Sequence, residues 1–238
     1  MQRQTSGQMK IVSVFRRPGR DVSPEPADKI FLRAGVGIDG DCHANALSPR
    51  QLLIVSTGSY EYCNAPPLSL RENILVKAND LKLSSGSLLR IGRLAMVRVT
   101  FECEPCGRLN RFGLGLSKRV RGKRGYLGRV VQSGFVEPGD KILVEEGVFS
   151  TFPDHWRDRL IEVADRLPRD CTLSYAQLAQ LAGIPKVFCR AFPRVLRSHE
   201  DLPWQRVVAS NQLNMSPYFV RKQRRLLGAI FGNETSLS

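Results

Sequence analysis

Two cysteines stand three positions apart in the segment Cys103-Glu104-Pro105-Cys106. A pair at this spacing can be a redox-active dithiol, half of a metal site, or two small residues packed in a core. A reactive thiol needs access to solvent and a lowered pKa. The nearby Arg108 and Arg111 could lower the pKa and the turn at Pro105 could expose the thiol, and inert packing remains the alternative.

The same pair is a weak candidate for a zinc site. Structural zinc takes four ligands, and the sequence holds no second CxxC segment. Cys42 and His43 could complete a set only if the fold brought them to the pair. The other cysteines are scattered, and a reducing compartment argues against a disulfide framework. We therefore expect neither zinc nor structural disulfides.

Four further motifs surround the cysteine pair along the chain. GVGIDGDCH predicts a Gly/Asp turn between two strands, Arg50-Gln51 opens an apolar strand, Arg71-Glu72-Asn73 precedes another, and GFVEPGD predicts a turn into the last strand. In this order and spacing they resemble the MOSC family, named for the C-terminal region of molybdenum-cofactor sulfurases. The resemblance spans about Met9–Val148 and rests on Gly35–His43, Arg50-Gln51, Arg71–Asn73, Glu102–Asn110 and Gly134–Ile142.

The resemblance implies a compact β-barrel-like fold that binds molybdenum cofactor (molybdopterin) or carries sulfur on a cysteine. Cys106 takes the reactive position, where a thiolate could hold a persulfide or contact molybdenum, a metal that suits soft sulfur ligands. Cys103 would be the resolving thiol. Larger family members carry a cysteine desulfurase domain that this chain lacks, so we expect a separate sulfur donor. The predicted cofactor-binding residues are His43, Arg50, Arg71, Asn73, Arg121 and Arg124.

A basic segment, KRVRGKRGYLGR at residues 118–129, contains six cationic and no acidic side chains. One interpretation is a solvated surface loop. The other is an anion site, either for a pterin phosphate or for a nucleic-acid backbone, whose binding would depend steeply on salt.

The C-terminal part of the chain contains a helix-turn-helix pattern. Leu173–Gly183 predicts a helix with Ser174 as N-cap and a glycine turn at its end, and Lys186–Arg197 predicts a second, basic helix. A second helix of this kind usually enters a DNA groove. Two packed helices with one solvated basic face would give the same pattern.

The segment Leu202–Asn211 contains Pro203-Trp204-Gln205-Arg206-Val207, which resembles the active-site strip of O6-alkylguanine-DNA alkyltransferases. That family has Pro-Cys-His-Arg-Val there, so Trp204 replaces the acceptor cysteine and Gln205 the histidine. The match covers about Phe152–Phe231. With tryptophan in place of the acceptor cysteine, this part of the chain is similar to the alkyltransferase-like proteins, which bind alkylated guanine without repairing it. Because tryptophan is no nucleophile and glutamine no base, we expect no alkyl transfer.

That resemblance also implies roles in reading double-stranded DNA with modified bases. Tyr175 would rotate the target phosphate and Arg190 would fill the vacated stack. Each of these side chains could instead be a packed core residue or a solvated charge. Pro193 departs from the family, which has glycine at this position. It falls inside the predicted second helix, where proline costs about 3 kcal/mol unless the helix starts late. The other predicted DNA contacts are Ser174, Lys186, Arg194 and Arg197, and the predicted lesion pocket consists of Trp204, Pro203, Gln205, Arg206 and Ser210.

Two kinds of element must position these residues. Up to about residue 148 the chain consists of short segments rich in Val, Ile and aromatic residues, separated by Gly, Pro, Asn and Asp. Beyond the linker at 148–156, apolar residues recur at spacings of three and four, which indicates helices. We predict an α+β protein of two domains: a MOSC-like β-barrel at 9–148 and a winged helix-turn-helix-like α domain at 152–231.

The composition limits the classes of function. The chain has 238 residues, of which 42% are hydrophobic, and a net charge of +14, which favours an anionic partner. It contains neither a membrane-length apolar run nor a signal peptide, so we expect a cytoplasmic protein without a membrane partner. In a bacterium it would be associated with the nucleoid, and in a eukaryote the nucleus is the alternative location.

Two hypotheses of different classes follow. The first is a non-enzymatic sensor of O6-alkylguanine-type or related modified bases that recruits a repair-protein partner. The alternative is a sulfur carrier or molybdenum-cofactor-dependent enzyme that uses Cys106. A third hypothesis combines the two: the MOSC-like domain would act on the base that the second domain presents. Only the presence of both domains in one chain motivates it.

Overall fold

The computed structural model describes residues 5–209 and 219–232. The chain forms two compact units. Unit 1 comprises Met1–Ala46 and Arg50–Phe152, and unit 2 comprises Leu47–Pro49 and Pro153–Ser238. The boundary near Phe152 falls inside the linker expected at 148–156.

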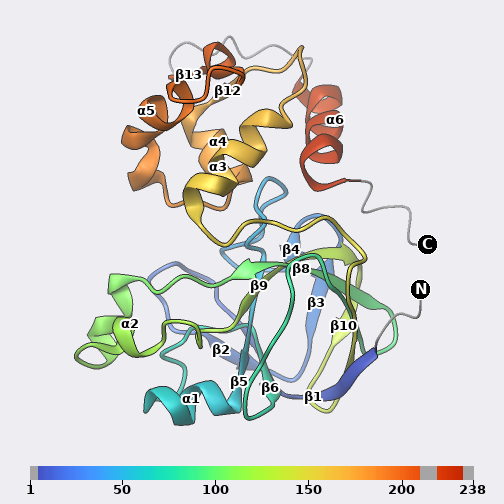
Figure 1. Cartoon of the computed structure of the whole chain (residues 1–238). Helices are drawn as coiled ribbons and strands as arrows, with labels where there is room; N and C mark the ends of the chain where they lie inside the picture. Colours follow the sequence, from blue (N-terminus) through green and yellow to red (C-terminus); the bar gives the residue numbers. More distant parts are fainter. Residues whose placement is uncertain (1–4, 210–218, 233–238) are drawn as a thin grey trace. The chain divides into compact units, whose positions relative to one another are not determined.

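Unit 1 is built around a closed β-barrel of seven strands (Figure 1), ordered β11-β7-β8-β9-β5-β6-β1, in which β1 pairs with β11 to close the ring. A closed barrel leaves no open edge between these strands. The short strand β2 extends the sheet beside β1, and β10, β3 and β4 form a separate three-stranded sheet. The strands are β1 (Thr5–Arg16), β2 (Glu25–Ala27), β3 (Ile30–Arg33), β4 (Gly37–Ile38), β5 (Leu52–Ser56), β6 (Ile74–Lys77), β7 (Leu88–Ile91), β8 (Ala95–Glu102), β9 (Tyr126–Gln132), β10 (Gly134–Val136) and β11 (Lys141–Glu145).

Alternating strand residues fill the barrel. Ile11, Ile54, Val97, Val130 and Ile142 each come from a different strand and are almost completely buried in one cluster. Such alternation is typical of strands with one face in a core. Burial of these side chains stabilises the barrel by roughly 25 cal/mol per Å² of apolar surface removed from water.

Most barrel neighbours are antiparallel, whereas β5 and β6 are parallel. Parallel neighbours need a crossover, and here it contains helix α1 (Thr57–Cys63). Between β8 and β9 the chain forms the 3₁₀ helix η1 (Gly107–Phe112) and the short helix α2 (Leu116–Arg119). Helices α1 and α2 lie outside the barrel (Figure 1). The barrel confirms the predicted β fold of this part of the chain.

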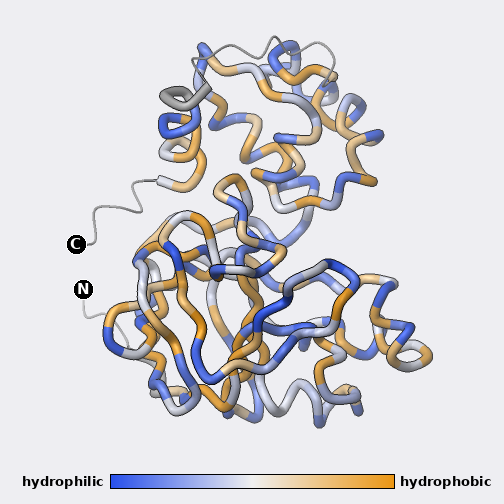
Figure 2. Tube along the Cα trace, turned by 180° about the vertical axis from the view of Figure 1, so that it is seen from behind, coloured by the Kyte–Doolittle hydropathy of each residue, from blue (hydrophilic) through white to orange (hydrophobic). Residues whose placement is uncertain are grey.

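Unit 2 is mainly helical. Its helices are α3 (Trp156–Asp165), α4 (Tyr175–Leu181), η2 (Lys186–Ala191), α5 (Phe192–Arg197), η3 (Trp204–Arg206) and α6 (Phe219–Phe231), and its strands are β12 (Leu173–Ser174) and β13 (Val207–Val208). The two strands pair in parallel, which brings the start of α4 beside the segment after η3. None of the described helices is long and apolar enough to cross a membrane, and hydrophilic residues interrupt the apolar ones along the trace in Figure 2. That unit 2 is a winged helix-turn-helix domain stays a prediction.

The predicted second helix at Lys186–Arg197 differs from the structure, which has η2 followed by α5. Because α5 begins only at Phe192, Pro193 occupies its first turn. An N–H group in the first turn has no partner inside the helix, so proline is tolerated there. The proline therefore moves the helix start instead of kinking a longer helix.

Candidate functional site

The glycine-rich turn at residues 35–43 contains the short strand β4 and ends in the site residues Asp41, Cys42 and His43. Gly37 and Gly40 have φ values of 123° and 75°, a region that favours glycine. A Cβ on Gly37 would lie 3.1 Å from the Cβ of Gln51. The Gln51 amide donates to the Gly35 carbonyl (2.9 Å), and its oxygen accepts from the Val130 amide (2.9 Å). Gln51 thus fixes this turn against the barrel.

Asp41 is the centre of a buried hydrogen-bond network. Its carboxylate accepts from the backbone N–H groups of Arg17 (2.9 Å) and His43 (2.8 Å) and from the Asn73 amide (2.8 Å). Burial alone would raise the pKa of Asp41, but the hydrogen bonds from His43 and Arg17 outweigh it and lower the pKa. The network therefore ties the glycine turn to the loop before β6.

The side chain of Asn73 makes hydrogen bonds to other residues of the protein. Its Oδ1 accepts from the Leu53 amide (3.0 Å) while its Nδ2 donates to Asp41, and the residue is buried. The predicted cofactor contact of Asn73 is thus not favoured by the structure. Asn73 instead positions Asp41.

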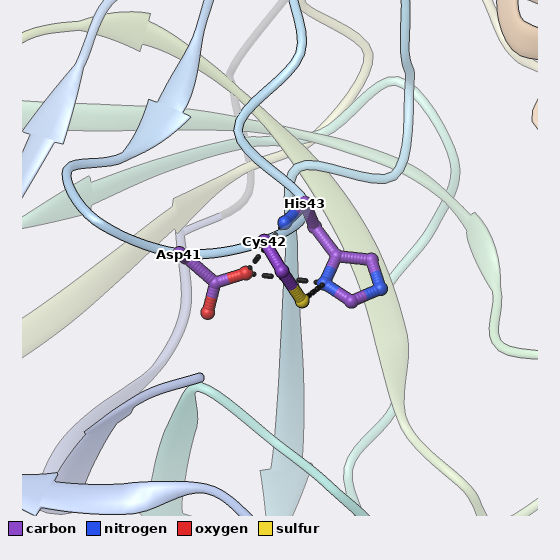
Figure 3. A group of neighbouring side chains, drawn as sticks. All are labelled: Asp41, Cys42 and His43. Atoms are coloured by element: carbon purple, nitrogen blue, oxygen red, sulfur yellow. Dashed lines mark hydrogen bonds and ion pairs between the residues drawn. The ribbon is translucent and has the colours of Figure 1, made fainter. Parts of the chain in front are cut away.

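Asp41, Cys42 and His43 form a compact group of side chains (Figure 3). The Cys42 Sγ lies 3.0 Å from His43 Nδ1, and the Asp41 Oδ1 lies 3.1 Å from the same nitrogen. Arg17 places one guanidinium nitrogen 2.7 Å from Nδ1 and 3.0 Å from Nε2 of His43. Burial lowers the pKa of His43, and the charges of Arg17 and Arg50 lower it further against the opposing effect of Asp41.

The two cysteines of the CEPC segment have different surroundings. Cys103 follows β8 and is buried, whereas Cys106 is exposed and occupies the N-cap position directly before η1. The Arg124 guanidinium donates to the Cys106 Sγ (3.6 Å) and to the Glu104 carbonyl (2.6 Å). Burial lowers the pKa of Arg124, but Cys103, Cys106 and Glu104 outweigh it and raise the pKa. An accessible thiol thus lies beside a buried cation.

Arg50 connects the cysteine segment to the glycine turn. One of its guanidinium nitrogens lies 4.0 Å from the Cys103 Sγ and another 4.0 Å from the Glu104 carboxylate. Its charge also acts on the His43 ring, whose pKa it lowers. The predicted residues His43, Arg50 and Arg124 therefore belong to one region of unit 1.

Four arginines, among them the Arg17 already described, border this region, and we call them the arginine cluster. Burial lowers the pKa of Arg71, and the charges of Arg17, Arg111 and Arg108 lower it further, while Cys42 acts in the opposite direction. Arg71 donates to the Val22 carbonyl (3.2 Å), and Arg108 lies 3.6 Å from the Asp21 carboxylate. Cations at this density favour a bound anion. The arginine cluster consists of Arg17, Arg71, Arg108 and Arg111.

Several guanidinium atoms of this region have no hydrogen-bond partner although they are buried. They are Arg17 Nε, Arg71 Nη1 and Arg124 Nε. A buried donor without a partner costs about 1–3 kcal/mol. These orphaned donors fit a site that holds an anionic ligand.

The basic segment 118–129 is not one solvated patch. Arg124 and Arg129 are buried, and Arg129 donates to the Ala46 carbonyl (2.9 Å). Lys123 pairs with Asp80 (2.8 Å), while Arg121 is exposed two residues beyond α2. Only Arg124 is placed beside the cysteines, and the cofactor role of Arg121 stays a prediction.

In unit 2, the predicted DNA contacts divide into two groups. Lys186 and Arg190 are exposed on η2, and Arg194 and Arg197 are exposed on α5, so they do not share one helix. Ser174 is buried and its hydroxyl accepts from the Gln177 amide in a capping box. The structure confirms Ser174 as N-cap, and this role does not favour a DNA contact.

Three predicted lesion-pocket residues, Trp204, Gln205 and Arg206, form η3, and Pro203 directly precedes it. Arg197 stacks over the Trp204 ring (5.3 Å), and Arg206 donates to the Leu167 carbonyl (3.2 Å). An open groove of about 710 Å³ lies between α3 and α5, but its lining does not include Pro203, Trp204, Gln205 or Arg206. Ser210 lies outside the described residues. Tyr175 is partly buried, and its ring and that of Phe192 pack at an angle of 65° to each other.

Sequence reasoning missed Arg17 and Asp41 as parts of the site. Both contact residues that are distant in the sequence. Asp41 is 32 positions from Asn73, and Arg17 is 26 positions from His43. The local signal that could have identified Asp41 is its position within the Gly-Asp-Cys-His segment. For Arg17 no local pattern marks the contact with His43.

Comparisons with known proteins match part of the chain to a family model and show similar folds. A family model described as MOSC domain matches residues 40–143. A crystal structure of the YUAD protein from Bacillus subtilis is 22% identical, with a TM-score of 0.53, and the match covers 59% of this chain and 98% of that chain. A crystal structure of a hypothetical protein is 19% identical, with a TM-score of 0.52, and covers 83% of this chain and 96% of its own.

A crystal structure of YiiM from Escherichia coli is 18% identical, with a TM-score of 0.48, and covers 85% of this chain and 100% of its own. The search of curated proteins gives no match. The first two structures show a similar fold, and the family match ends at residue 143, ahead of unit 2. Residues 40–143 of this chain, with Asp41, Arg50, Cys106 and Arg124 among them, therefore form a MOSC domain.

Proposed function

We propose that unit 1 carries sulfur or binds molybdenum cofactor, with Cys106 as the attachment point. The observation that carries this proposal is the exposed Cys106 thiol with the buried Arg124 guanidinium 3.6 Å from its sulfur. The chemical reactivity of a cysteine resides in its thiolate, which a neighbouring cation stabilises. Cys106 is therefore both accessible to solvent and close to a positive charge.

The residues present fit the cofactor. A thiolate suits molybdenum as a soft ligand, and the orphaned donors of Arg17 and Arg71 suit the phosphate of a pterin cofactor. Cys106 would hold the metal and the arginine cluster the phosphate. The cofactor, when bound, would supply the redox chemistry, while the protein holds and orients it.

The protein's own residues would then have distinct tasks. Arg124 stabilises negative charge on Cys106, and Asp41 with Asn73 holds the glycine turn in place. Cys103 would resolve a persulfide by attacking the Cys106 sulfur, which forms a Cys103–Cys106 disulfide and releases hydrosulfide. Because Cys103 is buried, this step requires the segment to move. A separate protein or small molecule with a sulfane sulfur would be the donor.

Two measurements on the purified full chain test this function. After expression in a host that makes molybdenum cofactor, metal analysis should find molybdenum in the wild type and not in Cys106→Ala. After treatment with sodium polysulfide, mass spectrometry should find an added sulfur on the Cys106 peptide. A chain that binds neither molybdenum nor sulfur at Cys106 would contradict the proposal.

A second candidate function concerns unit 2, as a reader of alkylated DNA without alkyl transfer. The observation that favours it is the parallel pair β12–β13, which places Leu173 and Ser174, directly before α4, beside Val207 and Val208, which directly follow η3. The exposed cations of η2 and α5 could contact phosphates. A mobility-shift comparison of duplexes with and without O6-methylguanine tests this role, and equal affinity for both would reject it.

A further inference from the structure

A second cationic surface of unit 1 lies on the segment at residues 107–122, which we call the basic arm. It consists of η1, α2 and the turns beside them, and it projects from the barrel (Figure 1). The arm contains five cationic and no acidic side chains, and no acidic residue stands between Glu104 and Glu137. Two of its cations, Arg108 and Arg111, belong to the arginine cluster. A surface of one charge sign favours an anionic partner.

The remaining cations of the arm differ from those that follow it in the sequence. Lys118 and Arg121 are exposed, and neither forms an ion pair with another residue that the structure describes. In contrast, Lys123 forms an ion pair and Arg124 is buried. The charge that a partner can reach is therefore carried by the arm and not by the whole basic segment 118–129.

The basic arm is held in place by buried side chains and hydrogen bonds. Leu109, Leu116 and Val120 are completely buried. The Ser117 N–H donates to the side-chain oxygen of Asn110 (3.0 Å), which joins α2 to η1. Binding by a preformed surface loses less conformational entropy than binding by a loose segment. The arm therefore presents its cations in a fixed arrangement.

The tip of the arm is a leucine that Arg119 holds in position. Arg119 Nε donates to the Cys63 carbonyl at the end of α1 (2.9 Å), and its Nη1 donates to the Leu114 carbonyl (2.7 Å). Leu114 stands between Gly113 and Gly115 and is 95% exposed. A single exposed leucine is common on protein surfaces. Here, however, its backbone is fixed and neither sequence neighbour has a side chain, so it can enter a narrow groove.

We propose that the basic arm is a contact surface for duplex DNA, in which Lys118 and Arg121 bind backbone phosphates and Leu114 enters the minor groove. Lysine and arginine supply many of the phosphate contacts in protein–DNA complexes. The minor groove is about 6 Å wide, and leucine is one of the apolar side chains that enter it. The inference concerns unit 1 alone, and it requires neither sulfur nor cofactor on Cys106.

Other anionic partners fit the arm less well. Interfaces between proteins are depleted in lysine and have an apolar centre, whereas the arm surrounds one exposed leucine with cations. Protein–DNA interfaces are more polar and more positively charged. An anionic membrane would attract the same charge. However, a leucine side chain buries less apolar surface than a myristoyl chain, which alone gives only marginal membrane binding.

The test measures binding of the full chain to a fluorescently labelled duplex of mixed sequence. Anisotropy gives the affinity and its dependence on salt between about 50 and 200 mM, the range over which phosphate contacts weaken strongly. The arm variants are Lys118→Gln/Arg121→Gln and Leu114→Ser. The matched control is Lys10→Gln/Lys141→Gln, which removes two exposed cations that are paired in register on β1 and β11. Circular dichroism checks that each variant is folded.

The variants should differ in both affinity and salt dependence. In Lys118→Gln/Arg121→Gln we expect binding at low salt to weaken about tenfold. The slope of log K against log salt should become shallower by about 2, because each phosphate contact contributes about 0.9. Leu114→Ser should weaken binding about fivefold at an unchanged slope, because leucine displaces no counterion. Lys10→Gln/Lys141→Gln should keep the wild-type slope and an affinity within about twofold of the wild type.

Three results would overturn the inference. Absence of duplex binding by the wild type, or equal losses in the arm and control double variants, would reject the arm as a DNA contact. Unchanged affinity in Leu114→Ser would reject the minor-groove contact. Tighter binding to vesicles that contain phosphatidylserine than to the duplex, lost in Leu114→Ser, would assign the arm to a membrane surface instead. All three would leave the proposed function of Cys106 intact.

Discussion

The chemistry of each cysteine follows from its neighbours. Cys106 is exposed beside Arg124, and Cys42 lies beside His43. Cys63 is buried, and burial raises the pKa of its thiol. The sequence could predict Cys106 because the CEPC segment and its flanking arginines are local. It could not predict the contact of His43 with Arg17, because 26 residues separate them.

Replacing the cation beside Cys106 should slow its reactions. In Arg124→Gln the Cys106 sulfur loses a guanidinium at 3.6 Å. We expect alkylation of Cys106 by iodoacetamide at pH 7 to slow about tenfold, which corresponds to about 1.4 kcal/mol. Arg124→Lys should retain most of the rate. An unchanged rate in both variants would show that Arg124 does not act on the thiol.

The shifted pKa of His43 predicts how stability depends on pH. Burial lowers the pKa of His43 below its ordinary value of 6.5. The folded state therefore favours the neutral ring, and this stabilisation is complete above pH 6.5 and is lost as the pH falls through the folded value. Urea unfolding of the wild type between pH 8 and 5 should show a loss that His43→Gln lacks. Parallel pH profiles of the two proteins would contradict this.

At the scale of elements, turn and cap residues determine where the site residues lie. The sequence predicted most barrel strands, since their alternation and their Gly and Pro boundaries are local signals. It did not predict β2, β3, β4 or β7. It also predicted one helix at 186–197 where the chain forms η2 and α5, because proline in a first turn and proline inside a helix look alike in sequence.

The capping box at Ser174 gives a prediction for unit 2. The Ser174 hydroxyl accepts from the Gln177 amide at the start of α4. Ser174→Ala should destabilise unit 2 by about 1 kcal/mol through loss of the N-cap. Thermal unfolding followed by circular dichroism measures this, with Ser198→Ala, an exposed residue at the end of α5, as control. Equal stability of Ser174→Ala and the wild type would show that the cap is not needed.

At the scale of the whole molecule, charge and site are divided between two units. The net charge of +14 indicated an anionic partner. The structure shows that part of this charge is internal, since Arg98, Arg129 and Arg159 are buried. The orphaned guanidinium donors belong to unit 1, whereas the exposed cations of η2 and α5 belong to unit 2. Composition alone could not separate these groups, because burial depends on tertiary packing.

The division into units predicts that the thiol site needs unit 1 alone. Asp41, Cys42, His43, Cys106 and Arg124 all belong to it. A chain ending at Phe152 should therefore fold and take up sulfur on Cys106 from polysulfide at a rate within about twofold of the full chain. Peptide mass spectrometry measures this rate. A folded truncated chain without sulfur on Cys106 would show that unit 2 contributes to the site.

The central claim is that Cys106 is the attachment point for sulfur or molybdenum. Its most direct test is the molybdenum content and polysulfide-derived sulfur of the wild type and Cys106→Ala, purified from a cofactor-competent host. We predict at least one of the two groups on the wild type and its loss in Cys106→Ala, with Cys189→Ser unchanged. Neither group on the wild type, or equal amounts on both proteins, would contradict the claim.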